Sequence, residues 1–97
     1  MAPDDEVKLL WDEHRSAPFP DGLAGEETAG VDLVLLDADI AGCIETSLGN
    51  KGRLDEWRKA VLAKCLDDLD RVLPLLQDAG AREYYERLRR LAQVTLA

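Results

Sequence analysis

The chain has few of the residues on which specialised small folds depend. Its 97 residues include two cysteines, one histidine, one methionine and one phenylalanine, and Val, Ile and Thr together number only 11. Two cysteines are too few to form a disulfide scaffold, and no apolar stretch is long enough to span a membrane. With 46% hydrophobic residues, the composition also excludes a disordered chain.

Leucine and alanine dominate what is present. They number 17 and 12, and this balance favours helix over sheet because both residues lose little side-chain freedom in a helix. A chain of 97 residues has room for one domain with a modest core. We therefore expect residues 1–97 to form a single all-α domain.

Apolar residues recur with the 3.6-residue period of a helix in four segments. The sequence predicts helices over residues 4–16, 31–48, 54–77 and 81–96. Short connections make consecutive helices antiparallel neighbours, so we predict an antiparallel bundle of the three longer helices, with the N-terminal helix packed across it. The loop over 17–30 is about twice the usual length, which makes it a candidate recognition segment.

The predicted helix over 31–48 is apolar on two sides. Besides its main apolar face it has a second face of smaller residues, made by Val31, Leu35, Ala38 and Gly42. Such a helix is usually central in a bundle or covered by another subunit, and we expect this helix to be central. Thr28 is its expected N-cap.

The predicted helix over 54–77 has one wide apolar face. Trp57 falls on that face at helical spacing, so we expect the indole to contribute to the core. Pro74 lies inside the pattern, where it removes a backbone hydrogen bond and should kink the last turn.

The charge is unevenly distributed along the chain. Residues 1–50 hold 12 acids and two bases, whereas residues 51–97 hold eight acids and ten bases, for a net charge of −8. A field of this sign repels phosphate backbones and anionic membranes, so we expect no membrane partner and disfavour nucleic acid. The first residues lack the basic region of a signal peptide. We therefore expect a cytoplasmic location, with Cys43 and Cys65 reduced.

The string LVLLDAD at 33–39 deserves comparison with known motifs. It resembles the first motif of haloacid-dehalogenase-like phosphatases and the metal-binding D-x-D of many glycosyltransferases. Both families place the motif at the end of a parallel strand in a larger α/β domain, whereas this chain continues at helical spacing. We therefore interpret the string as helix, and expect no catalytic residue, no metal and no cofactor.

Asp37 nevertheless falls in the middle of the main apolar face of its helix. Burying an unpaired carboxylate is costly, so this side chain must find a partner or stay protonated. Two interpretations stay open. Asp37 is either a structural residue, hydrogen-bonded to a Tyr, Trp or Arg of a neighbouring helix, or a functional residue that lines a small pocket or an interface.

Arg58 is the matching polar residue on the apolar face of the next helix. In a hairpin of the two helices its level differs from that of Asp37 by about seven residues, or roughly 10 Å, so we expect Glu45 to be its partner instead. His14, the only histidine, lies on the apolar stripe of the first helix. No nucleophile or orienting carboxylate is evident for it, and we expect a packed core residue.

Several segments of the sequence together resemble a known group of proteins. The combination of LWDEHR, APFP, VDLVLLDADIAGC and LDEWR, between residues 10 and 58, resembles a family of small helical bacterial proteins. The resemblance implies a bacterial cytoplasmic setting, and it attaches no activity, cofactor or binding residue.

These features favour a non-enzymatic protein-interaction or self-associating domain. The two-sided helix motivates this hypothesis, together with an acidic N-terminal half in which Asp32 and Asp39 form a candidate acidic face. The expected partner is a second copy of the chain or a basic protein. One alternative is a small-molecule binder or enzyme with a polar pocket around Asp37, helped by Arg58. A weaker alternative is nucleic-acid binding through the arginines of residues 82–90.

Overall fold

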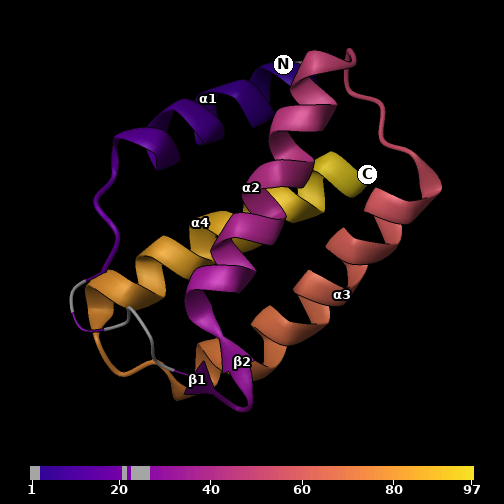
Figure 1. Ribbon diagram of the computed structural model, residues 1–97. Helices are drawn as coiled ribbons and strands as arrows, with labels where there is room; N and C mark the ends of the chain where they lie inside the picture. Colours follow the sequence, from indigo (N-terminus) through magenta and orange to yellow (C-terminus); the bar gives the residue numbers. More distant parts are fainter. Residues whose placement is uncertain (1–2, 21, 23–26) are drawn as a thin grey trace.

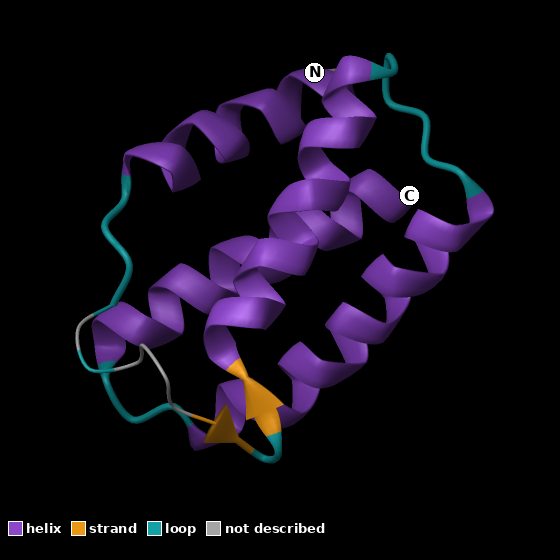
Figure 2. Cartoon of the chain, viewed as in Figure 1, coloured by secondary structure: helices purple, strands orange, loops and turns teal. Residues whose placement is uncertain are grey.

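The computed structural model describes residues 3–20, 22 and 27–97. Its elements, in chain order, are α1 (Pro3–Ser16), β1 (Glu27–Thr28), β2 (Val31–Asp32), α2 (Leu33–Gly49), α3 (Glu56–Val72), the 3-10 turn η1 (Leu73–Leu75) and α4 (Ala79–Leu96). Four helices and a hairpin of two short strands, each of two residues, confirm the predicted all-α class (Figure 2). In the described part of the chain, no helix combines the length and apolarity needed to cross a membrane.

Helix α4, rather than α2, is the helix with the most extensive packing. It packs against α1, α2 and α3 together, and in Figure 1 it passes behind α2 while α1 and α3 lie on either side. Helix α2 also contacts all three other helices, so the central place predicted for it is shared with α4. Helix α2 packs against α3 and α4 and, less extensively, against α1, while its second face is left without a covering helix (Figure 1).

One hydrophobic core joins the helices. Its largest fully buried side chains are Leu33, Ile40, Ile44, Leu62, Leu69, Val72, Tyr85, Leu88 and Leu91. Cys43 and Cys65 are also buried in it, and both thiols are free. Burial raises the pKa of the Cys65 thiol from 9.0 to about 12, because the apolar surroundings disfavour the thiolate.

An aspartate caps each of the three longer helices at its N-terminus. The side chains of Asp32, Asp55 and Asp78 accept the backbone N–H three residues further along, at 3.0, 2.8 and 2.9 Å. Each cap satisfies one of the backbone donors that a helix start leaves unpaired. The predicted cap Thr28 is wrong, because that residue lies in β1 and α2 begins only at Leu33.

The short hairpin accounts for this later start of α2. Strands β1 and β2 pair in antiparallel fashion through a two-residue turn at Ala29 and Gly30. Both turn residues have positive φ, 53° and 76°, which is the backbone geometry that suits the twist of a two-residue hairpin. The other part of the predicted loop that links α1 to β1, residues 21 and 23–26, lies outside the described residues.

The third helix is shorter than the predicted span 54–77. Helix α3 stops at Val72, and Pro74 lies in the 3-10 turn that follows. Proline has no backbone N–H to continue the helical ladder. It therefore ends the helix, whereas the sequence predicts a kink within a longer helix.

Candidate functional site

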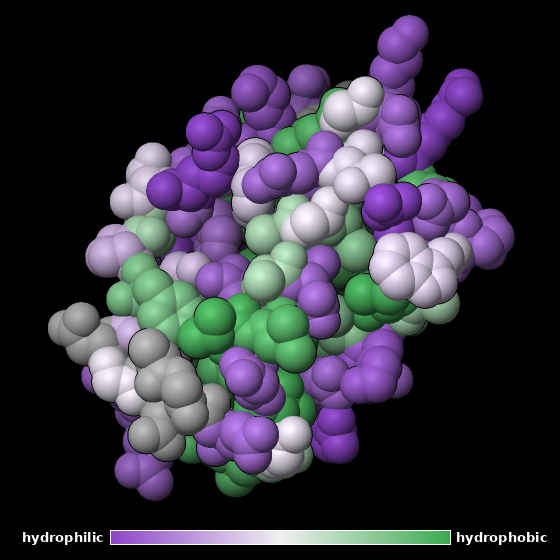
Figure 3. Space-filling model, viewed as in Figure 1, coloured by the Kyte–Doolittle hydropathy of each residue, from purple (hydrophilic) through white to green (hydrophobic). Residues whose placement is uncertain are grey.

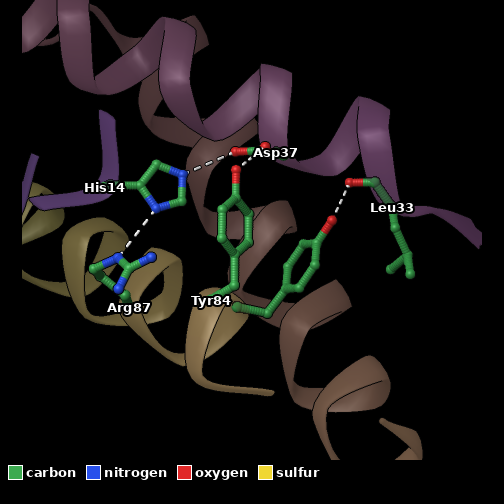
Figure 4. A network of polar contacts seen from close by, with 6 residues as sticks. His14, Leu33, Asp37, Tyr84 and Arg87 are labelled. Atoms are coloured by element: carbon green, nitrogen blue, oxygen red, sulfur yellow. Dashed lines mark hydrogen bonds and ion pairs between the residues drawn. The ribbon is translucent and has the colours of Figure 1, made fainter. Parts of the chain in front are cut away.

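Asp37 is the centre of a polar network that links three helices (Figure 4). The Tyr84 hydroxyl, from α4, donates to Asp37 Oδ2 at 2.5 Å, and His14 Nε2, from α1, lies 3.2 Å from Asp37 Oδ1. The Asp37 side chain is 18% exposed, whereas that of His14 is only 5% exposed. Tyr84 is thus a partner of the kind that the structural interpretation of Asp37 requires.

The fourth member of the network identifies which tautomer of the histidine ring fits its contacts. Arg87 Nε donates to His14 Nδ1 at 3.3 Å. Arginine keeps its proton at Nε, so Nδ1 must be the acceptor. With this assignment, Nε2 carries the proton and donates it to Asp37. In this way His14 joins α1 to both α2 and α4.

Aromatic packing closes the network. The ring of Tyr84 lies 4.4 Å from the His14 ring between centroids, and Phe19 meets it edge-on at 5.6 Å. Burial, together with the neighbouring Asp37 carboxylate, holds the pKa of Tyr84 well above its usual range. The adjacent Tyr85 donates to the backbone carbonyl of Leu33 at 2.7 Å, and its pKa is likewise raised, chiefly by burial.

Each polar group of this network has a hydrogen-bond partner within the chain. Both ring nitrogens of His14 are engaged, and each carboxylate oxygen of Asp37 has a partner. A general base needs a free nitrogen or oxygen within reach of a substrate proton. Over the described residues, no cluster of His, Cys, Asp and Glu could hold a metal ion. The arrangement is that of a polar link between helices.

A pocket of about 420 Å³ opens beside the network, between residues 17–20 and the first turns of α4. Tyr84 and Arg87 are among its lining residues, but Asp37 is not. Two acids, Asp78 and Glu83, line it as well. The small-molecule alternative, a binder or enzyme with a polar pocket around Asp37, therefore stays a prediction.

Arg58 has other partners than the sequence predicts. Its guanidinium pairs with Asp55 at 2.5 Å and lies over the ring of Trp57, 5.6 Å from the centroid. The expected partner Glu45 is therefore wrong, and Arg58 and Asp37 do not meet. Asp55 is closer because the cap residue and Arg58 are three apart on the first turn of α3.

The candidate acidic face is also different from the expectation. Asp32 and Asp39 line one hollow of about 310 Å³, but Lys64 and Arg71 of α3 line the same hollow. Asp32 is further occupied as the cap of α2. The surface at these two aspartates therefore carries both signs of charge.

The second apolar side of α2 is exposed next to α3, and we call this surface the α2–α3 face. It consists of Leu35, Ala38 and Gly42 on α2 with Trp57 and Val61 on α3. Leu35 is 58% exposed and Trp57 is 69% exposed, so the expectation that Trp57 lies in the core is wrong. Green, hydrophobic atoms gather over the lower half of α2 in Figure 3.

The centre of the α2–α3 face is shallow. A hollow of about 260 Å³ is lined by Ala38, Gly42, Trp57 and Val61, among others. A Cβ atom added at Gly42 would meet nothing within 4 Å. Small residues on α2 thus leave room beside the projecting indole of Trp57.

The arginines of α4 contact groups on other elements while they stay at least partly exposed. Arg82 donates to the Leu76 carbonyl, Arg87 to His14, Arg89 to Asp70 and Arg90 to Glu6. These contacts link α4 to α1 and α3. Nucleic-acid binding through these arginines stays a prediction.

Comparison with family models, with curated proteins and with solved structures found no match to the chain.

Proposed function

We propose that the protein is a non-enzymatic interaction domain that binds another protein through the α2–α3 face. The observation that carries the proposal is the exposure of two large apolar side chains, Trp57 and Leu35, on adjacent helices. Covering the exposed part of a tryptophan of about 200 Å² at about 25 cal/mol per Å² contributes roughly 3 kcal/mol to binding. Tryptophan is also among the residues that dominate the energetics of interfaces.

The charges near this face support recognition of a protein surface. Arg58, Lys64 and Asp39 lie at its edge, where charges set orientation and association rate more than affinity. The network at Asp37, by contrast, is internally satisfied and is assigned a structural role. On the resemblance noted above, we place the domain in the bacterial cytoplasm.

The test compares three tagged chains in cells of the source organism: wild type, Trp57→Ala and Leu9→Ala. Leu9 is 57% exposed but lies on α1, so it controls for the loss of any exposed leucine-sized side chain. We expect wild type and Leu9→Ala to retain the same protein, whether a different chain or an untagged copy, and Trp57→Ala to lose it. Identical retention by all three chains would contradict the proposal.

A further inference from the structure

We infer that the occupant of the α2–α3 face is a second copy of this chain, related by a two-fold axis that runs along the helices. The inference rests on the proposed function and names its partner. In this arrangement α2 of one copy lies over α3 of the other, and the four helices form an interchain bundle.

The shape of the face is complementary to itself. Trp57 projects from α3, while Gly42 leaves open space on α2, and both residues line the same hollow. A two-fold axis parallel to the helices keeps each residue at its own level. It therefore brings Trp57 of each copy to the gap at Gly42 of the other, as a two-fold interface requires.

The charges follow the same pattern. Helix α2 has acids and no base, and its exposed Asp39 has no ion-pair partner among the residues that the structure describes. Lys64 on α3 pairs with Asp68 of its own helix at 3.3 Å, but it is 77% exposed, lines the same hollow as Asp39 and can reach a second carboxylate. At equal levels along the axis, Asp39 of one copy faces Lys64 of the other, twice in each dimer.

A strongly basic protein fits this face less well. Such a partner would be attracted to Asp39 but would meet Arg58 and Lys64 beside it, and like charges at an interface suppress the wrong partner. The net charge of −8 is therefore not concentrated where the apolar residues are.

The size of the face is adequate for a dimer. Helices α2 and α3 have 17 residues each, and a helix of this length is about 25 Å long. A standard interface buries about 800 Å² on each partner, which is about one seventh of the accessible surface of 5906 Å². Two adjacent helices can supply this area, and we expect a dissociation constant of about micromolar order.

Sedimentation equilibrium of the full chain, from about 1 µM to about 1 mM, measures the dimer directly. Gly42→Leu fills the gap that Trp57 needs, and we expect it to weaken dimerisation by about 100-fold or more. The same change should leave the monomer folded, because the site has open space and leucine is the better helix former. Leu9→Ala is the matched control and should dimerise as wild type does.

Exchanging the charges of Asp39 and Lys64 tests the proposed two-fold axis of the dimer. Asp39→Lys and Lys64→Glu should each weaken dimerisation about tenfold, because each places like charges opposite one another in two pairs. The double variant with both changes restores opposite charges and should recover most of the loss. Additive losses in the double variant would overturn the proposed pairing.

Failure of the dimer and failure of the proposed function give different results. If wild type stays monomeric at every concentration while Trp57→Ala alone loses a captured protein of another kind, the second copy is wrong and the interaction role stands. A monomer whose captured proteins do not depend on Trp57 overturns both.

Discussion

Removal of one hydroxyl tests whether the network at Asp37 is structural. In Tyr84→Phe, Asp37 loses the 2.5 Å bond and keeps only His14. A hydrogen bond to an ionised group contributes about 1.5–3 kcal/mol. Since the carboxylate is 18% exposed, water replaces part of the bond, and we expect the free energy of unfolding to fall by about 1–2 kcal/mol.

The free energy of unfolding should fall further when the Asp37 carboxylate itself is removed. Asp37→Ala leaves two buried donors, the Tyr84 hydroxyl and His14 Nε2–H, without their acceptor. Each unsatisfied buried group costs about 1–3 kcal/mol, so the free energy of unfolding should fall by about 2–6 kcal/mol. Urea unfolding followed by far-ultraviolet circular dichroism at neutral pH measures both variants, with the slope m checked for constancy.

The decisive measurement is a double-mutant cycle between Asp37→Asn and Tyr84→Phe. Residues in one hydrogen bond should show a coupling free energy of about 1 kcal/mol or more. Tyr85→Phe is the matched control, because its hydroxyl donates to the neutral carbonyl of Leu33 instead. Its effect should add to that of Asp37→Asn. The structural role is refuted if the Tyr84 cycle is additive and Asp37→Ala stays within about 0.5 kcal/mol of wild type.

Three further predictions concern the helix ends and the titration of buried groups. Lys51 holds a left-handed conformation, φ 57°, where α2 ends, so Lys51→Gly should raise the thermal unfolding midpoint by relieving about 1 kcal/mol of strain. Asp78→Ala removes the cap of α4 and should lower the free energy of unfolding by about 1 kcal/mol in urea. The raised pKa values of Cys65, Tyr84 and Tyr85 mean that the folded state keeps its protons while the unfolded chain loses them. The stability contributed by these groups should therefore be constant at neutral pH. It should fall by up to about 1.4 kcal/mol per pH unit for each group, above about pH 9 for Cys65 and above about pH 10 for the two tyrosines, as urea midpoints across the alkaline range would show.

The helices and the need for a partner at Asp37 could be predicted from the sequence. Helical periodicity is a local property, and it placed all four helices to within a few residues, apart from the 3-10 turn at Pro74. A carboxylate in the middle of an apolar face is equally local. Its burial cost holds whichever helix packs against it, so the sequence alone required a partner for Asp37.

The identity of the partners could not be predicted in this way. His14 and Tyr84 lie 23 and 47 residues from Asp37 along the chain, and only the crossing of α1 and α4 over α2 brings them together. The arginines of α4 show the same limit. In-helix acids are available at the right spacing, yet Arg90 reaches Glu6 on α1 and Arg89 reaches Asp70 on α3. Long side chains choose among partners that only the packed helices supply.

The exposure of Trp57 has a related cause. The apolar stripe of α3 is wider than the surface that α2 and α4 can cover, and a hydrophobic pattern does not show where that cover ends. A signal was present in the other helix: α2 has a second apolar side made of small residues. Two neighbouring helices can each have more apolar surface than the core covers. When the uncovered apolar residues of both helices lie on the same side of the molecule, they indicate an interface.

The structural network and the docking face should therefore be energetically separate. The network ties α1, α2 and α4 together by bonds that the monomer already makes, whereas Trp57 is 69% exposed and contributes little to the folded monomer. Trp57→Ala should change the unfolding free energy of the monomer by no more than about 1 kcal/mol, including its contact with Arg58. Tyr84→Phe should do the reverse, lowering stability while the folded protein associates as wild type does. If each variant changed both the unfolding free energy and the association, the two sites would be coupled through α2. The network and the docking face would then not be energetically separate.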